Sequence, residues 1–401
     1  MSLYVLKFGG SSVATPARIN HISEIISEFI SDGHRIVVVT SAMQGVTNQL
    51  IELTKSFSDS PFNREYDAVV SSGEQVAAGL LAMALNSKGI QARSMTAWQV
   101  PIEVCGTYSD AEISHVGSKK LLDQLDRGII PVVTGFQGIS RMGDVCTIGR
   151  GGSDATACAV AKFINADECL IYTDVDGVYT ADPRIVLDAQ RIDNISYDDM
   201  IELASWGAKV LQNKSTLIAK DYRVSLRVLS SFSDGLGTKV SDKTDYVLKG
   251  PIAGIAHTLD YLILKVQNHS RTKQLLAQYI KDDLSKDLIH NKIPGSFLIL
   301  KSYQSEIKNI LDENKIEFEI DNDIGLVTVV GDIKGGSPEL VSGDKFPIMH
   351  EILETIDNAI QNLGINNRKV MIREQSISVI VPFQQTVPLV NKLHEMFLEK
   401  R

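Results

Sequence analysis

The stretch LYVLKFGGSS (residues 3–12) joins an apolar run to a pair of glycines. Its first part, Leu3–Phe8, is expected to be a strand that ends at the glycines. Residues 18–31 follow with apolar side chains at helical spacing, and Arg35–Ala42 (RIVVVTSA) is a second apolar, β-branched run. A run that is apolar on both faces suits a parallel strand buried between layers of helices. The N-terminal segment therefore predicts a strand–helix–strand unit.

The same alternation continues to about residue 245. Strands are expected where short β-branched runs occur, and helices where apolar residues recur at a period near 3.6. This order predicts an α/β fold with a mostly parallel sheet and helices on both faces. The expected strands are Gly128–Phe136 and Glu168–Val175, and the expected helices are Ala68–Leu85, Ser153–Ile164, Ser196–Lys209 and Asn213–Asp221.

A polar, turn-rich segment near Ser230–Gly250 is expected to be a linker between two domains, 1–245 and 246–401. The remaining chain predicts two βαββαβ units of ferredoxin-like type. The first spans about 260–321, and the second about 325–401. The second lacks a fourth strand, which Pro251–His257 would supply, so the two units are expected to be interleaved. The expected elements, in order, are strand 261–266, helix 271–283, strand 287–291, strand 296–302, helix 304–314, strand 316–320, strand 326–331, helix 347–363, strands 370–373 and 377–381, and helix 386–399.

Composition narrows the functional class. The chain has 401 residues, a formal net charge of −9 and 22% charged residues, with no block of Lys or Arg. Nucleic acid and anionic membranes are therefore unfavourable partners. The four cysteines form no CxxC pair and are expected to be free thiols. No signal-peptide pattern and no bilayer-spanning stretch is expected, which favours the cytoplasm.

Five short motifs combine glycines with charged or hydroxyl side chains. KFGGSS places Lys7 before Gly9, Gly10 and Ser11, where backbone N–H groups can form an anion nest. TSAMQGVTN offers Ser41 and Thr47, SSGEQ offers Glu74 in the first turn of a helix, and TIGRGGSDATACAV offers Arg150 and Asp154. TDVDGVYTADPR offers Thr173, Asp174, Tyr179 and Arg184, and WGAKVL offers Lys209.

Most of these motifs, taken singly, have a simpler explanation. KFGGSS and TSAMQGVTN fit ordinary turns, Glu74 fits the helix-dipole preference, and Lys209 fits a solvated surface lysine. TDVDGVYTADPR is more specific, because many polar groups gather at the end of one strand. KFGGSS is neither GxGxxG nor GxxxxGK[ST], so neither the dinucleotide-binding nor the P-loop interpretation applies to it.

Together and in this order, the motifs resemble those of the aspartokinases of the amino acid kinase superfamily. The resemblance covers nearly all of the N-terminal domain, and more weakly the C-terminal part, which resembles paired ACT domains. It implies transfer of the ATP γ-phosphoryl group to the β-carboxylate of L-aspartate. That reaction is the first step towards lysine, threonine, methionine and diaminopimelate.

The resemblance also implies roles for the motif residues. Lys7 would stabilise the transferred phosphoryl group and Asp154 would orient Lys7. Aspartate would be bound by Ser41, Thr47, Glu74 at its α-ammonium and Arg150 at its α-carboxylate. The ATP site would be formed by Lys7, Gly9, Gly10, Ser11, Thr173, Asp174, Tyr179, Arg184 and Lys209. Mg²⁺ would be held through the ATP phosphates, with no metal site made by protein side chains alone.

The ACT resemblance implies a homodimer and an end-product effector, lysine or threonine or both. The loops that would bind it, Gln267–Gln274 and Gly331–Pro347, depart from the expected pattern, so a purely structural dimerisation module stays open. Two other functions also stay open. One is a kinase for glutamate or acetylglutamate, and the other is a regulatory amino-acid-binding protein that has lost catalysis.

Overall fold

The computed structural model describes residues 1–57, 64–242, 251–277, 296–333, 347–366 and 368–399. These residues form two compact units. The first contains Met1–Val178, Arg191–Ile201 and Lys209–Val247, and the second contains Tyr179–Gln190, Glu202–Ala208 and Leu248–Arg401. The predicted domain boundary at residue 245 remains a prediction, and the units differ from it in two segments that the second unit takes from the first part of the chain.

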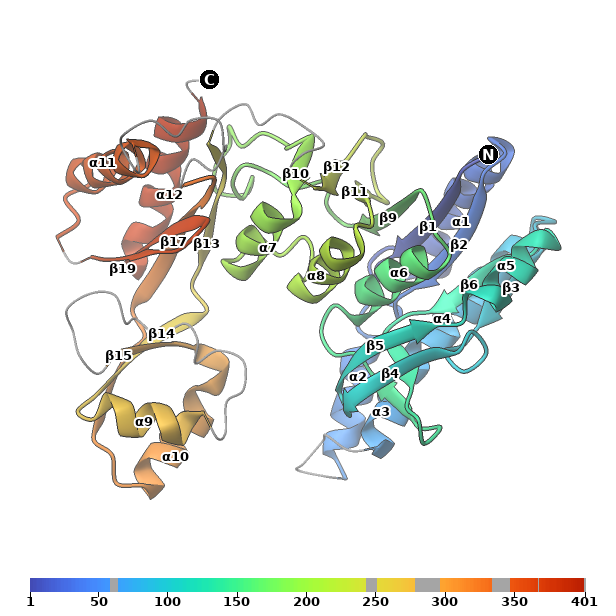
Figure 1. Cartoon of the computed structure of the whole chain (residues 1–401), viewed down its shortest axis with the longest axis horizontal. Coiled ribbons are helices and arrows are strands. Elements are labelled where there is room, and N and C mark those ends of the chain that lie inside the picture. Colours follow the sequence, from blue (N-terminus) through green and yellow to red (C-terminus); the bar gives the residue numbers. More distant parts are fainter. Residues whose placement is uncertain (58–63, 243–250, 278–295, 334–346, 367, 400–401) are drawn as a thin grey trace. The chain divides into compact units, whose positions relative to one another are not determined.

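An eight-stranded sheet forms the centre of the first unit, in the order β10-β12-β11-β9-β1-β2-β6-β3 (Figure 1). Every pair in it is parallel except β11–β12, so the predicted parallel α/β sheet is confirmed. The strands are β1 (Leu3–Phe8), β2 (Arg35–Thr40), β3 (Ala92–Met95), β6 (Ile130–Thr134), β9 (Glu168–Thr173), β10 (Asn194–Ser196), β11 (Leu226–Ser230) and β12 (Thr238–Ser241).

Helices cover both faces of this sheet. Leu6 and Phe8 of β1 point to the face covered by α1 (Pro16–Ser31) and α4 (Ser72–Ser87), where they join one buried apolar cluster. On the opposite face α6 (Gly152–Phe163) lies against β1, β2 and β9. Because successive side chains of a strand alternate between faces, the runs that are apolar throughout satisfy both layers. The other helices described in the unit are α2 (Val46–Lys55), α3 (Arg64–Val70), α5 (Ser118–Asp126) and α8 (Asn213–Tyr222), together with the first part of α7 (Tyr197–Ser205), which continues into the second unit at Glu202.

A second, smaller sheet in the first unit has the order β5-β4-β7-β8. Its strands are β4 (Ile102–Thr107), β5 (Asp110–Val116), β7 (Gln137–Ile139) and β8 (Val145–Thr147). The sequence prediction contains none of these strands, because they are short and mix polar with apolar residues. The sheet matters for the site, since β8 leads directly into the glycine-rich stretch before α6.

Two expectations from the sequence are wrong in this unit. Part of the predicted linker, Thr238–Ser241, is strand β12, which pairs with β11 and buries Thr238 and Val240. The polar, turn-rich composition of its neighbours hid this strand. The helical stretch Arg64–Ser87 is long and apolar enough to cross a membrane by length and composition alone, although no such stretch was expected. Half of its apolar window is buried inside the unit, and core helices of soluble proteins meet the same criteria of length and composition.

The second unit contains two antiparallel sheets, in the orders β13-β17-β19-β18 and β15-β14-β16. Strand β13 (Ile252–Thr258) pairs with β17 (Ile324–Gly331), so the strand before the first ferredoxin-like unit completes the second one. This is the interleaving that the sequence predicts, although residues 287–291 lie outside the described residues. The other elements are β14 (Tyr261–Val266), α9 (His269–Leu276), β15 (Ser296–Leu300), α10 (Gln304–Glu313), β16 (Phe318–Asp321), α11 (Pro347–Asn362), β18 (Lys369–Ile372), β19 (Ser376–Pro382) and α12 (Thr386–His394).

The two segments taken from the first part of the chain are built into the second unit. The carbonyl of Thr180 accepts a hydrogen bond from the N–H of Ile255 at 2.7 Å, beside the edge strand β13. Ala181 and Val186 belong to the apolar core formed by α11, α12 and this sheet. Trp206 is fully buried beneath the guanidinium of Arg373, which lies 4.5 Å from the centre of its ring. Both segments therefore contribute core residues to the second unit.

Candidate active site

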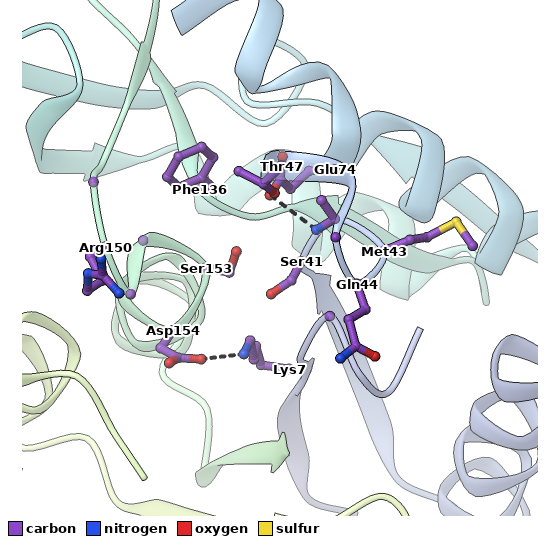
Figure 2. Close-up of a pocket in the computed structure, with 16 residues that line it drawn as sticks. Lys7, Ser41, Met43, Gln44, Thr47, Glu74, Phe136, Arg150, Ser153 and Asp154 are labelled. Atoms are coloured by element: carbon purple, nitrogen blue, oxygen red, sulfur yellow. Dashed lines mark hydrogen bonds and ion pairs between the residues drawn. The ribbon is translucent and has the colours of Figure 1, made fainter. Parts of the chain in front are cut away.

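A pocket of about 280 Å³ opens at the carboxyl ends of β1 and β2, beside the N-terminus of α6. Parallel strands end at the same edge of a sheet, which is where α/β proteins bind ligands. Figure 2 shows Glu74 and Thr47 at one end of this pocket and the Lys7–Asp154 pair at the other, with Ser41 and Ser153 between them. The lining residues are Lys7, Gly10, Ser41, Ala42, Met43, Gln44, Gly45, Thr47, Glu74, Phe136, Gly149, Arg150, Gly151, Gly152, Ser153 and Asp154.

Lys7 and Asp154 form an ion pair at one end. The ammonium nitrogen of Lys7 lies 2.6 Å from Oδ1 of Asp154, and the two side chains are only 9% and 13% exposed. Lys7 lies near the end of β1, whereas Asp154 lies in the first turn of α6, where the helix dipole favours a carboxylate. The two motifs that carry these residues are far apart in the sequence and meet here.

Glu74 is the buried carboxylate at the other end. It is 3% exposed, its Oε1 accepts the N–H of Ala42 at 3.1 Å, and its Oε2 accepts no hydrogen bond from the described residues. Burial raises the pKa of Glu74 to about 7, and the bond from Ala42 opposes that shift only in part. The unsatisfied oxygen is suited to a cationic group of a ligand, which would remove the cost of burying the charge.

Gly73 explains how Glu74 reaches the pocket. A Cβ at Gly73 would lie 2.9 Å from Cβ of Ala42 and 3.2 Å from Cγ1 of Val46. Only glycine lets α4 approach the loop after β2 so closely. Gly73 therefore allows the close contact between α4 and the loop, and this contact places the carboxylate of the next residue, Glu74, in the pocket.

The glycine-rich stretch 149–152 forms the wall between the two ends. Gly149 and Gly151 have φ values of +79° and +74°, a region that favours glycine. A Cβ at Gly152 would lie 2.9 Å from the ring of Phe136, so this glycine is needed for close packing. Arg150, between the glycines, is exposed and makes no hydrogen bond or ion pair with the described part of the chain. Its guanidinium is available to an anionic ligand.

The turn after β1 has the features of a phosphate cradle. A Cβ at Gly10 would lie 3.0 Å from the carbonyl oxygen of Ala42, so the loop after β2 closes over it. The N–H of Gly9 donates to the carbonyl of Tyr172 at 3.0 Å and is therefore occupied. In the described residues the N–H groups of Gly10 and Ser11 make no such backbone bond, which leaves them available for an anion.

The structure brings together seven of the residues predicted from the motifs and leaves others outside the pocket. Those lining it are Lys7, Gly10, Ser41, Thr47, Glu74, Arg150 and Asp154. Thr173 and Asp174 lie at the end of β9, next to β1, and the hydroxyl of Thr173 donates to Asp174 at 3.0 Å. Tyr179 and Arg184 belong to the second unit, where Arg184 pairs with Asp182 at 2.7 Å, and Lys209 returns the chain to the first unit.

Five lining residues that carry side chains were not predicted from the sequence: Ala42, Met43, Gln44, Phe136 and Ser153. Phe136 was predicted as the last residue of a strand, but β6 ends at Thr134 and the φ of Phe136 is +68°, which is unusual for an aromatic residue. Ser153 adjoins Asp154 inside a motif that was recognised, so its position in the first turn of α6 could have suggested it.

The sequence model of the Amino acid kinase family matches residues 2–230, more than half of the chain, and the chain belongs to this family. Within it, the aspartate kinase of Pseudomonas fluorescens is 37% identical, over 99% of this chain and 98% of that protein. Such identity over nearly full length places the chain among the aspartate kinases. The family predicted from the motifs is confirmed.

Solved structures agree on the fold. Aspartokinase III of E. coli in complex with aspartate and ADP, described as the R-state, matches with a TM-score of 0.80 at 24% identity, over 99% of this chain and 100% of that chain. The same enzyme in complex with lysine and aspartate, described as the T-state, matches with a TM-score of 0.76 at 24% identity, again over 99% and 100%. The whole chain, including the second unit, therefore follows the aspartokinase fold.

Proposed function

We propose that this protein phosphorylates the β-carboxylate of L-aspartate with ATP, yielding 4-phospho-L-aspartate and ADP. The observation that carries the proposal is the pocket itself. Among the described residues it combines a buried carboxylate with an unsatisfied oxygen, an unpaired guanidinium and a lysine–aspartate ion pair. An α-amino acid presents an ammonium and a carboxylate that match the first two groups, and an acidic side chain that can reach the third.

Substrate binding would use both signs of charge. Glu74 would accept the α-ammonium at Oε2, and the guanidinium of Arg150 would bind the α-carboxylate through two parallel N–H groups. The hydroxyls of Ser41 and Thr47 would complete the site. Ionic contacts at two points fix the amino acid in one orientation, so the β-carboxylate faces the Lys7–Asp154 end.

The chemical step requires positioning and charge screening more than proton transfer. The β-carboxylate is already a nucleophile at neutral pH. One of its oxygens would attack the γ-phosphorus, a new P–O bond would form, and the bond to the β–γ bridging oxygen would break, with the electron pair leaving on ADP. Lys7 would neutralise charge that develops on the transferred group, and Asp154 would hold its ammonium in place.

ATP would be held from the turn after β1. The N–H groups of Gly10 and Ser11 would bind phosphate oxygens, while Gly9 would contribute mainly by having no side chain. Thr173, Asp174 and Lys209, which belong to the same unit, would hold the rest of the nucleotide, and the roles of Tyr179 and Arg184 stay predictions from the motif. When bound, Mg²⁺ would neutralise phosphate charge, and ATP would supply most of its ligands. In the described residues no group of three or more His, Cys, Asp or Glu side chains could hold a metal ion alone.

A substrate-competition assay tests the proposal. Production of ADP is coupled to a spectroscopic readout with aspartate, glutamate or N-acetylglutamate as acceptor. We expect turnover with aspartate, and none with N-acetylglutamate, because an acetylated nitrogen carries no charge for Glu74. Turnover with glutamate alone would refute the assignment, and absence of any turnover would favour an amino-acid-binding protein that has lost catalysis.

The second unit is proposed to be regulatory. Its two interleaved ferredoxin-like sheets would pair with those of a second copy and bind lysine, threonine or both, so that the kinase is inhibited by an end product. An inhibition screen with each amino acid and with their mixture, alongside sedimentation of the free and bound protein, tests this. Inhibition by neither would leave a purely structural dimerisation module. We propose that the enzyme acts in the cytoplasm, at the start of lysine, threonine, methionine and diaminopimelate synthesis.

A further inference from the structure

A second buried carboxylate, Asp67, lies outside the pocket and has no place in the chemistry above. It lies on α3, is 0% exposed, and forms no ion pair with the described residues. In the described part of the chain its two oxygens accept four hydrogen bonds, two from Ser109 and two from Thr147. One oxygen accepts the backbone N–H groups of Ser109 at 2.9 Å and Thr147 at 2.7 Å, and the other accepts their hydroxyls at 2.9 and 3.0 Å.

The two donors come from the segments that support the glycine-rich stretch. Thr147 is the last residue of β8 and stands three positions before Arg150. Ser109 lies in the turn between β4 and β5, and its carbonyl oxygen would be 3.1 Å from a Cβ at Gly149. Through Thr147, Asp67 therefore holds the residues that precede the glycine-rich stretch. Through Ser109 it holds the turn that packs against Gly149.

Ser109 shows that the carboxylate holds a conformation that would otherwise be unfavourable. Its φ is +68°, which costs a residue with a side chain about 1–2 kcal/mol. Hydrogen bonds to an ionised group are stronger than neutral ones, and Ser109 donates two of them to Asp67. The strained turn is consequently fixed to α3.

The side chain of Lys214 also binds the segment that leads into Gly149. Its ammonium donates to the carbonyl of Ile148 at 2.7 Å and to that of Ala111 at 3.0 Å, and it pairs with Asp110 at 2.9 Å. Thr147 and Ile148 are thus held on two sides immediately before Gly149 and Arg150. Because glycines restrict the backbone little, the position of Arg150 depends on how the residues on either side of the stretch are held, α6 after it and Thr147 and Ile148 before it.

Asp67 also shares a helical stretch with Glu74. Residues 64–87 form one helical stretch, in which the carbonyl of Asp67 accepts the N–H of Ser71 at 3.1 Å where α3 meets α4. Positions seven apart lie on the same helix face, two turns from each other. The same helical stretch, made of α3 and α4, therefore carries Glu74, proposed for the substrate ammonium, and Asp67, which anchors the loop proposed for the substrate carboxylate.

We propose that Asp67 is a positioning residue that sets the distance between Glu74 and Arg150, and thereby selects a free α-amino acid as the acceptor. This rests on the proposed function, because the roles of Glu74 and Arg150 belong to it. Asp67 touches no lining residue of the pocket by hydrogen bond, so its effect on substrate passes through the stretch that carries Arg150.

The test compares three variants of the full-length enzyme. Asp67→Ala removes all four hydrogen bonds, and we expect the KM for aspartate to rise at least tenfold while the KM for ATP changes less than threefold. Asp67→Asn keeps the shape. Its amide oxygen can accept the two N–H groups while its NH₂ donates to the two hydroxyls, so we expect it to stay within threefold of the wild type. Thr147→Val removes one hydroxyl and should give an intermediate rise, even if Asp67→Ala folds poorly.

Asp144→Asn is the matched control. Asp144 also ties α3 to the β7–β8 hairpin, through Arg64 at 2.5 Å, and it accepts the hydroxyl of Tyr108 at 3.1 Å, but in the described part of the chain it makes no hydrogen bond to Thr147 or Ser109. We expect it to lower stability without changing the KM for aspartate. An equal rise in both KM values for Asp67→Ala, or the same rise in the KM for aspartate for Asp144→Asn, would overturn the positioning role.

Two further measurements separate this proposal from the proposed function. In an Arg150→Ala background, Asp67→Ala should change the KM for aspartate less than twofold, because its route to the substrate is already lost. Amide hydrogen exchange at residues 148–152 should quicken in Asp67→Ala whatever the acceptor is. Quickened exchange without aspartate turnover in the wild type would refute the proposed function alone. Unchanged exchange in an enzyme active on aspartate would refute the role of Asp67 alone.

Discussion

The two ends of the pocket handle buried charge in opposite ways. At one end Lys7 and Asp154 neutralise each other at 2.6 Å before any ligand arrives. At the other end Glu74 has no counter-charge among the described residues, one of its oxygens is unsatisfied, and burial raises its pKa to about 7. The first end is electrostatically complete and suited to chemistry, whereas the second is completed by the substrate and suited to recognition.

The largest expected effect comes from removing the ion pair between Lys7 and Asp154. Lys7→Met should lower kcat by about 10³-fold, as loss of a group that stabilises transition-state charge does, while the KM for aspartate changes little. Single-turnover and steady-state kinetics measure the two parameters. Lys55→Met, at an exposed lysine on α2, is the control and should leave both unchanged. A Lys7 variant with a normal kcat would remove Lys7 from the chemical step.

Replacing Glu74 should weaken aspartate binding and at the same time stabilise the free protein. Glu74→Gln should raise the KM for aspartate by about 100-fold, the cost of losing a buried charge pair with the substrate. The same change should stabilise the free protein at pH 8. A carboxyl whose pKa rises on folding binds more protons in the folded state, so its contribution to stability falls as pH rises from 4.5 to about 7.

At pH 8 the folded protein therefore bears a cost of about 3 kcal/mol for the ionised Glu74, which Gln avoids. Denaturant unfolding of wild type and Glu74→Gln at pH 8 and pH 4.5 measures it. We expect a gain at pH 8 that vanishes at pH 4.5. A loss of stability at both pH values would show that Glu74 is satisfied in the free protein and would remove the contrast between the ends.

The pH dependence of the wild type sharpens the comparison. Below about pH 7 Glu74 is protonated in the free enzyme and cannot pair with an ammonium, so the KM for aspartate should rise up to tenfold per pH unit as pH falls. Calorimetry in buffers of different ionisation enthalpy should also show proton release on binding aspartate near pH 7. A flat profile in the wild type, identical to that of Glu74→Gln, contradicts the assignment.

The smallest expected effect concerns the contact that places Glu74. Gly73→Ala would bring a methyl group within 2.9 Å of Cβ of Ala42, so the helix or the loop must shift, at a cost of about 1–3 kcal/mol. We expect a lower Tm and a KM for aspartate raised about threefold. Gly79→Ala is the control, because nothing lies within 4 Å of a Cβ there, and it should raise stability slightly. Equal results for both variants would mean that the close contact is unimportant.

Sequence patterns predict β1, β2, β6 and β9 of the central sheet, because these strands are apolar on both faces and the helices between them are strongly periodic. They fail for β3, β10, β11 and β12, which lie towards the two edges of that sheet, and for β4, β5, β7 and β8, which are short and mix polar with apolar residues. These segments become strands because they pair with strands elsewhere in the fold, and the local sequence pattern does not show that pairing.

The site divides in a similar way. Lys7, Glu74, Arg150 and Asp154 stand in motifs whose residue types already suggest charge chemistry. Asp67 stands in an ordinary helical turn, and its partners are 42 and 80 residues away. Phe136 looks like the end of a strand until its backbone conformation is known. Residues that act through neighbours distant in the sequence are therefore found only in three dimensions.

The second unit is discontinuous in sequence. The chain contributes Tyr179–Gln190 and Glu202–Ala208 to it before the C-terminal part, from Leu248 on, completes it. A gene fragment that stops at the end of the N-terminal half would leave Trp206 without its cover and Val186 without its core. Recombination between related enzymes at that point would mix mismatched surfaces. A chimaera that exchanges the C-terminal part would therefore have to include these two segments as well. The segment of the gene that must be exchanged is larger than the one that encodes the contiguous C-terminal part.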